Sequence, residues 1–444
     1  MKYLILCSFF PPDSAISAVR PYMFSKYLYK DGNEITVIRS GEFNNFPDDS
    51  LPELPSDISV ISFLGNECDA EKYIRGEYKR KIELKNSTSA IPSKFGVFLR
   101  KLYHIIREPY DVCNRISTAK RFFHKQKQAI DSLEDKEFDI VFSTYSNLEN
   151  VFGGEYASKK FNAKWIMDFR DPITEYGRKE GIIWNIIATH IEKKILKTAD
   201  VCTVVSEGLK NDLMSIYKDA NLYVLYNGYE SENNTSSDQQ NHLSDKLTFC
   251  YTGQFYGTRL EALDVLLLCL KEMIEKGDIA SNKLRFIYAG PDSDVVKAHF
   301  NRFSLTRILE DHGYVTRNEA LLLQEEADVF LVLSWNTAYS QGVLTGKFFE
   351  GIRCRKPILS IVMGNIPNSD LSILNSKYHY GFCYEEANKD VSEQKLVEFL
   401  YKCYSDIITS GKIKYNQSEE LSSAFSYKNL TKDLERLSIE IEGD

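Results

Sequence analysis

The 444-residue sequence lacks several patterns by which catalytic and structural sites are usually recognised. It contains no GxxxxGK[ST] phosphate-binding loop, no GxGxxG dinucleotide fingerprint, and neither GxSxG nor HExxH. Its nine cysteines are scattered without CxxC or CxxH spacing, and none of its seven histidines precedes His104. These absences argue against a disulfide framework and a local zinc site, and they leave common hydrolase and nucleotide-binding loops unsupported.

Long apolar runs are missing as well. No segment approaches the roughly 18 apolar residues that cross a bilayer. The N-terminal MKYLILCSFFPPD has neither the longer apolar core nor the small-residue cleavage site of a signal peptide, so we expect a cytoplasmic protein. The composition, 43% hydrophobic and 27% charged, is that of a globular protein, and the length suggests two or three domains.

Positive charge is scarce overall but concentrated in one place. The net charge of −8 disfavours bulk nucleic-acid binding. Residues 1–228 are nearly balanced, yet residues 72–127 hold 15 Lys and Arg against four acidic residues. This stretch includes Phe95–Ile106, whose apolar residues recur at helical spacing. We interpret it as a helix on an anionic membrane surface or, alternatively, as a core-facing helix with a solvated basic side.

Apolar strands alternate with helical segments along the whole chain, which predicts an α/β protein with parallel sheets. We expect two doubly wound Rossmann-like domains facing a central cleft, with ligands outside the strand ends. The predicted divisions are an acceptor domain at 1–228, a polar linker at 229–246, a donor domain at 247–426, and a C-terminal helical segment at 427–444 that could return to the first domain. Predicted strands lie at 2–10, 34–39, 138–143, 164–167, 201–205, 222–225, 247–251, 284–289, 328–333 and 357–361.

Several short phrases, taken in order, resemble the glycosyltransferase family 4 enzymes of the GT-B fold, especially bacterial capsule and O-antigen enzymes. They are FFPPD with AVRPY near the N-terminus, WIMDFRDP at 165–172, YNG at 226–228, YTGQFYG at 251–257, and GKFFEG at 346–351 followed by KPIL. The resemblance covers nearly the whole chain. It implies a transferase that moves a sugar from a nucleotide-diphospho-sugar, with retention at the anomeric carbon and with no required cofactor or metal.

Glu350 is the leading candidate for donor binding. A carboxylate can accept two hydrogen bonds from a ribose diol, and the family's matching Glu has that role. Lys347 and the start of the same helix suit a diphosphate, although a Glu near a helix start can also merely complement the dipole. The resemblance extends the predicted donor site to Gly253, Gln254, Tyr256, Arg259, Gly290, Tyr314, Val315, Thr345 and Gly346.

The sequence departs from the family pattern within this site. The family commonly has two Glu separated by seven residues, so the first would fall at Gly342, next to the neutral Gln341. The usual Arg and Lys pair after the first donor-domain strand is also not evident, with Arg259 and Gln254 the nearest substitutes. We expect Arg259 to offset charge on the leaving diphosphate, unless it is an ordinary surface residue.

On the acceptor side, Asp168, Arg170 and Asp171 follow a predicted strand. We expect Asp171 to orient a sugar hydroxyl or Arg170 to bind an acceptor phosphate, as catalytic residues. The alternative is an internal Asp–Arg pair that holds the strand end. The other wall of this side is assigned to Asp13, Ser14 and Arg20.

The resulting expectation is a transferase that extends a glycan or polyprenyl-diphosphate-linked acceptor at the inner face of a membrane, with residues 72–127 in contact with that membrane. Two alternatives stay open. One is a UDP-sugar 2-epimerase of the same fold, which would act without an acceptor. The other is a non-catalytic sugar-nucleotide-binding scaffold, for which the missing Glu at position 342 is the best argument.

Overall fold

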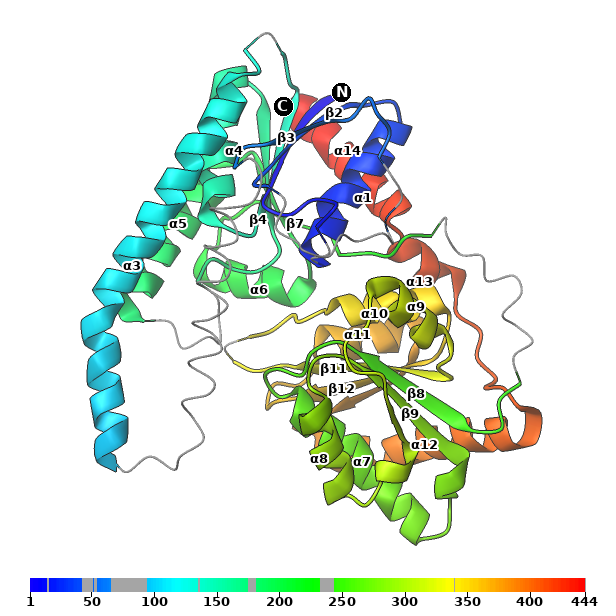
Figure 1. Cartoon of the computed structure of the whole chain (residues 1–444). Helices are drawn as coiled ribbons and strands as arrows, with labels where there is room; N and C mark the ends of the chain where they lie inside the picture. The colour runs from blue at the N-terminus through cyan, green and yellow to red at the C-terminus, as the bar shows by residue number, and fades with distance from the viewer. Residues whose placement is uncertain are drawn as a thin grey trace. The chain divides into compact units, whose positions relative to one another are not determined.

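The computed structural model describes residues 1–13, 16–41, 51, 54–64, 94–134, 136–174, 181–231, 243–338 and 340–443, with the backbone alone over 94–106. The chain forms two compact units (Figure 1). Unit 1 comprises Met1–Val205, Leu213–Leu225 and Thr431–Asp444, and unit 2 comprises Ser206–Asp212 and Tyr226–Leu430. The basic stretch 72–127 is therefore described only from residue 94 onward, and Ser14 lies outside the described residues.

Unit 1 is built on a seven-stranded parallel sheet. The strand order β3-β2-β1-β4-β5-β6-β7 reverses direction at β1 and β4, as in doubly wound folds. Apolar residues fill the central strands on both faces, which is why these segments have continuous rather than alternating hydrophobicity. The strands are β1 (Lys2–Cys7), β2 (Glu34–Arg39), β3 (Ser59–Ser62), β4 (Ile140–Tyr145), β5 (Lys164–Phe169), β6 (Val201–Val204) and β7 (Leu222–Val224).

Helices follow these strands in the order that parallel crossovers require. The helices are α1 (Ile16–Lys30), α3 (Lys94–Asp131), α4 (Leu148–Phe161), α5 (Ile182–Thr198) and α6 (Glu207–Ile216). Helix α3 packs against α4 and α5. None of the helices in the described ranges combines the length and the hydropathy of a membrane span.

Unit 2 repeats the architecture with a six-stranded parallel sheet of order β10-β9-β8-β11-β12-β13. Its strands are β8 (Leu247–Thr252), β9 (Leu284–Ala289), β10 (Leu309–Asp311), β11 (Val329–Trp335), β12 (Ile358–Met363) and β13 (Gly381–Glu385). Its helices are α7 (Arg259–Glu275), α8 (Ser293–Arg302), α9 (Arg317–Glu325), α10 (Gly346–Cys354), α11 (Asp370–Tyr378), α12 (Lys389–Ser410) and α13 (Glu419–Ala424), with short 3₁₀ turns η2 (Ser281–Lys283), η3 (Thr306–Ile308) and η4 (Glu386–Asn388).

Two apolar layers sandwich this second sheet. Helices α7, α8 and α12 pack on one face against residues such as Phe249 and Leu331. Helices α10, α11 and α13 pack on the other face against Phe330 and Val332. The alternation of neighbouring strand residues between the two layers explains why both faces are apolar. In this sheet β8 and β11 are neighbours, paired in parallel with Phe249 beside Val329 and Cys250 beside Phe330.

The last helix, α14 (Tyr427–Gly443), begins in unit 2 and runs into unit 1. Within unit 1, the Asn33 amide donates to the Glu435 carboxylate at 2.7 Å. Tyr229, at the start of the expected linker, is buried in unit 2, where its hydroxyl donates to the Ser422 carbonyl at 3.0 Å. Most of that linker, 232–242, lies outside the described residues.

Candidate functional site: a nucleotide-binding edge in unit 2

The predicted donor residues gather at the carboxyl edge of the unit 2 sheet. The order of the strands reverses there between β8 and β11, the place where doubly wound sheets bind ligands. The loop Gly253–Gly257 follows β8, Gly290 follows β9, and α10 begins at Gly346. The structure therefore brings residues that are about a hundred positions apart in the chain to one edge.

Glu350 lies in the second turn of α10 and is held from two sides. Its Oε2 accepts a hydrogen bond from Gln324 Nε2 at 2.7 Å and one from Lys347 Nζ at 2.9 Å. Burial acts to raise the pKa of Glu350, but the charges of Lys347 and Arg317 and these hydrogen bonds outweigh it and keep the pKa below its ordinary value. The side chain is an ionised acceptor, and its Oε1 takes no hydrogen bond from the described residues.

Gln324, on α9, was not singled out in the sequence. Its Nε2 bonds both Glu350 and the Thr252 hydroxyl, the latter at 2.8 Å, and its side chain is almost fully buried. It thereby fixes the rotamer of Glu350 relative to the end of β8. No sequence signal marks Gln324, because the sequence of an amphipathic helix does not show whether a glutamine faces solvent or a carboxylate.

Lys347 lies against the loop that follows β8. Gly253 has φ +117°, a conformation that side chains rarely adopt, and a Cβ added there would lie 3.3 Å from Lys347 Cε. A glycine at this position lets the lysine approach the loop closely. Lys347 is thus placed between Glu350 and the backbone of the Gly253 loop.

The start of α10 has unsatisfied polar groups. Thr345 is the N-cap residue, but its side chain makes no capping hydrogen bond. Its buried Oγ1 has no partner within the described residues. The first N–H groups of a helix and the positive end of its dipole favour an anion, and the ammonium of Lys347 adds a full charge. This arrangement suits a phosphate.

Arg259, Gln254 and Tyr256 form a separate cluster at the other end of the loop. The Arg259 guanidinium donates to the Gln254 carbonyl at 3.2 Å and to the Tyr256 hydroxyl at 2.9 Å. It also lies 3.8 Å from the centroid of the Tyr256 ring, and Arg259 is only 5% exposed. Arg259 is therefore not a surface residue, and its action on a diphosphate stays a prediction.

The remaining predicted donor residues lie beside β8 and β9. Gly290 N donates to the Gly313 carbonyl at 2.7 Å, and a Cβ on Gly290 would collide with the Gly253 carbonyl. Tyr314 is 76% exposed, whereas Val315 packs against the small apolar cluster that includes Ala289.

In unit 1 the predicted acceptor residues separate into buried and exposed groups. Arg20 and Asp168 form a bidentate ion pair, with Nε to Oδ2 at 3.0 Å and Nη2 to Oδ1 at 2.7 Å. Both side chains are buried, and so is Asp13, whose Oδ2 accepts from the Phe10 amide at 3.3 Å. Arg170 donates to the Ser17 carbonyl at 3.0 Å, and Asp171 is exposed. The internal Asp–Arg pair considered above is present, with Arg20 rather than Arg170 as the partner of Asp168.

A polar cluster at the carboxyl ends of β1 and β4 was missed in the sequence. Ser8 accepts hydrogen bonds from Asn147 and Asn150 and donates to Glu149 Oε1 at 3.4 Å. Burial raises the pKa of Glu149 to about 7, and its buried Oε2 has no partner in the part of the chain that the structure describes. The phrase Ser-Asn-Leu-Glu-Asn directly after a strand was the available signal.

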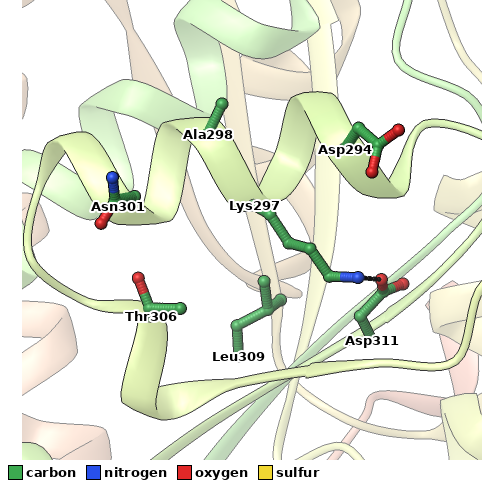
Figure 2. A pocket seen from close by; sticks show the side chains of 7 residues that line it. All are labelled: Asp294, Lys297, Ala298, Asn301, Thr306, Leu309 and Asp311. Carbon is green, nitrogen blue, oxygen red and sulfur yellow. Dashed lines mark ion pairs between the residues drawn. The ribbon is translucent and has the colours of Figure 1, made fainter.

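A pocket of about 630 Å³ lies elsewhere in unit 2, on α8 and β10 (Figure 2). Within its lining, Lys297 Nζ lies 2.7 Å from Asp311 Oδ2. None of the predicted donor residues lines it. In the described residues, no three His, Cys, Asp or Glu side chains come together as a metal site would require.

Comparisons with known proteins identify the fold. No family model and no curated protein sequence matches the chain. Solved structures do match over its length. Sucrose-phosphate synthase from Thermosynechococcus elongatus is 12% identical with a TM-score of 0.60, and the match covers 100% of both chains. The lipopolysaccharide outer core galactosyltransferase WaaB is 12% identical with a TM-score of 0.55 and 99% of both chains covered, and TarM from S. aureus, in complex with UDP and α-GlcNAc-glycerol among others, is 10% identical with a TM-score of 0.56, covering 98% of this chain and 99% of that one.

The chain therefore has the GT-B fold. The predicted pair of doubly wound Rossmann-like domains is confirmed by the two parallel sheets and by these likenesses. At sequence identities of 10–12%, these likenesses establish the fold and nothing further.

Proposed function

We propose that this protein is a glycosyltransferase that moves a sugar from a nucleotide-diphospho-sugar to a glycan or lipid-linked acceptor. The observation that carries the proposal is the line formed by Glu350, Lys347 and the Gly253 loop at the β8–β11 reversal. An ionised carboxylate with one open oxygen suits a ribose diol, and the neighbouring ammonium and helix start suit a diphosphate. The complex of TarM with UDP supports this donor class.

The proposal includes the narrower expectations drawn from the resemblance: a family 4 enzyme of the capsule or O-antigen type that retains the anomeric configuration without a metal. WaaB, a galactosyltransferase of the lipopolysaccharide outer core, and TarM, solved in complex with α-GlcNAc-glycerol, support a surface-glycan acceptor. On the protein's side, Glu350 would orient the nucleoside, and Lys347 with the α10 N-terminus would stabilise the charge that develops on the departing diphosphate.

Contact with a membrane belongs to the same proposal. In unit 1, Ile182 and Ile186 on α5 are 75% and 66% exposed, and Tyr110 on α3 is 68% exposed. Glu108 of α3 accepts the Ile183 amide at 2.6 Å, which fixes the start of α5 beside the basic helix. Exposed isoleucines next to a lysine- and arginine-rich helix suit an anionic lipid surface.

Two experiments test these proposals. Purified protein is incubated with nucleotide sugars and lipid-linked acceptors, and glycan extension is measured. We expect donor-dependent extension that the Glu350→Ala variant loses together with nucleotide affinity. An absence of turnover with unchanged nucleotide affinity in Glu350→Ala would refute the proposal, and release of an epimerised sugar without acceptor would favour the epimerase. Membrane contact is tested by sedimentation with lipid vesicles. We expect the protein to sediment with phosphatidylglycerol vesicles but not with phosphatidylcholine vesicles, and we expect the Ile186→Glu variant to sediment less with phosphatidylglycerol. Equal sedimentation of that variant would exclude this surface.

A further inference from the structure

Two aromatic side chains stand at the strand reversal of unit 2, apart from the groups assigned to the nucleotide. Tyr256 follows β8, and Trp335 is the last residue of β11. Their rings form a T-shaped pair with centroids 5.8 Å apart. Tyr256 is 45% exposed and Trp335 is partly exposed, so the pair is not part of the sealed core. Neither side chain is needed by the carboxylate and lysine of the nucleotide site.

The pair is held in place by its neighbours. The Trp335 indole N–H donates to Ser340 Oγ at 3.0 Å. The Tyr256 hydroxyl accepts from the Arg259 guanidinium, which also lies over the Tyr256 ring and 5.7 Å from the Trp335 centroid. An exposed aromatic pair with fixed rotamers presents a preformed apolar surface, and ordering it costs little when a ligand binds.

The loop after β8 relates this pair to the nucleotide groups. At one end, Gly253 lies against Lys347; at the other, a Cβ added to Gly257 would lie 3.3 Å from the Trp335 ring. Glu350 lies beyond Lys347, on the side of α9. The order along the edge is therefore carboxylate, lysine, loop, aromatic pair. A nucleotide sugar has the matching order of ribose, diphosphate and glycosyl group.

We infer that Tyr256 and Trp335 bind the glycosyl group of the donor by stacking on its apolar C–H face, and that Arg259 is a positioning residue that orients the Tyr256 ring. This inference rests on the proposed function. According to this inference, Tyr256 and Trp335 select the sugar of the donor and not its base. A pyranose ring has one face of C–H groups that an aromatic ring can cover, and a buried hydroxyl-binding site is not required for this contact.

The test compares each nucleotide sugar with its own nucleotide. Binding of UDP-glucose, UDP-N-acetylglucosamine, GDP-mannose and ADP-glucose, and of UDP, GDP and ADP, is measured by calorimetry for wild type, Tyr256→Ala and Trp335→Leu. We expect both variants to lose about five- to tenfold in affinity for the nucleotide sugar that wild type binds, while affinity for the bare nucleotide changes less than about twofold. Tyr401→Ala, which removes an exposed tyrosine from α12, serves as the matched control and should alter neither.

Two further variants separate stacking from folding and positioning. Trp335→Phe keeps a ring and should retain most of the affinity for the nucleotide sugar even if Trp335→Leu is unstable. Tyr256→Phe keeps the ring but loses the bond to Arg259, so it should weaken nucleotide-sugar binding less than Tyr256→Ala.

Each outcome decides the matter. If Tyr256→Ala and Trp335→Leu lose affinity equally for the nucleotide and the nucleotide sugar, the pair contacts the base. If they lose affinity for neither, the pair does not contact the donor. Both results overturn the inference while the proposed function stands. If wild type binds none of the probes, the proposed function fails and the inference fails with it.

Discussion

The buried ion pair between Arg20 and Asp168 gives the sharpest prediction about unit 1. The Asp168 carboxylate accepts four hydrogen bonds: two from Arg20, one from Thr144 at 2.9 Å and one from Thr203 at 2.7 Å. Arg20 also donates to the Leu225 carbonyl at 2.9 Å. These contacts link α1 with β4, β5, β6 and the end of β7, so the pair joins most of the sheet's carboxyl edge.

The replacement Asp168→Asn should lower the free energy of unfolding of unit 1 by about 3–5 kcal/mol, because it leaves a buried guanidinium without its counter-charge. In either orientation of the side-chain amide that Asp168→Asn introduces, its nitrogen would also face two hydrogen-bond donors. The two hydrogen bonds lost from a charged group, at about 1.5–3 kcal/mol each, give a similar total of about 3–6 kcal/mol. The loss is a large part of the roughly 5–15 kcal/mol that stabilises a typical domain.

Urea unfolding followed by tryptophan fluorescence measures this effect. The chain has three tryptophans, and Trp165 and Trp184 are both buried in unit 1. A Trp335→Phe background therefore reports on unit 1 alone. Arg20→Met and the double variant complete a cycle, and the double variant should cost less than the sum of the two single changes. A loss below about 1 kcal/mol for Asp168→Asn, or strict additivity, would refute the structural role of the pair.

The pH dependence provides an independent check. Burial acts to raise the pKa of Asp168, but Arg20 and the hydroxyl donors outweigh it and hold the pKa below its ordinary value. A lowered native pKa stabilises the fold above the unfolded-state pKa of about 4, and that contribution is lost as pH falls through the native pKa. Asp168→Asn should remove this part of the acid sensitivity.

Three further changes test other parts of the molecule. Glu149→Gln should raise the free energy of unfolding above pH 7 by up to about 3 kcal/mol. The native pKa of about 7 lies above the ordinary 4.5, so the wild type loses stability as the pH rises between these two values. Urea unfolding from pH 4 to 8 should show a weaker dependence of the unfolding free energy on pH in the variant. Lys347→Met should weaken UDP binding by about ten- to a hundredfold but uridine binding by less than about threefold, as calorimetry would show. Thr316→Ala should cost about 1 kcal/mol, since it removes the capping box of α9, and a Thr306→Ala control in denaturant unfolding should cost less.

The alternation of apolar runs and helical spacing was sufficient to predict most of the fold. The predicted strands at 34–39 and 284–289 match β2 and β9 residue for residue. The short strands β3, β10 and β13 were missed, because half-buried edge strands such as Ser59–Ser62 and Gly381–Glu385 lack a strong apolar pattern. The segment 95–106 is helical as expected, although its helix extends to Asp131.

Site residues were predictable where one helix carries them and not where two elements meet. Lys347 and Glu350 are three positions apart, so their ion pair follows from helical geometry. Arg20 and Asp168 are 148 positions apart, and the sequence alone could not choose between Arg20 and Arg170 as the partner. Gln324 and Glu149 were missed for the same reason, since burial of a polar side chain depends on packing between elements.

The absence of a second Glu before Glu350 has a physical explanation in the backbone. Gly342 has φ +67°, a left-handed conformation that costs a residue with a side chain roughly 1–2 kcal/mol. Around Gly342, Ser334 Oγ donates to the Val343 carbonyl at 3.0 Å, and the backbones of Thr337 and Ser340 form a β-bridge. A loop with this path cannot readily present a carboxylate from position 342. The same loop instead supplies Ser340, which orients the Trp335 indole. Gly342 and the Ser340 contact to Trp335 thus belong to one loop, and the inferred contact of Trp335 with the sugar depends on the conformation of that loop.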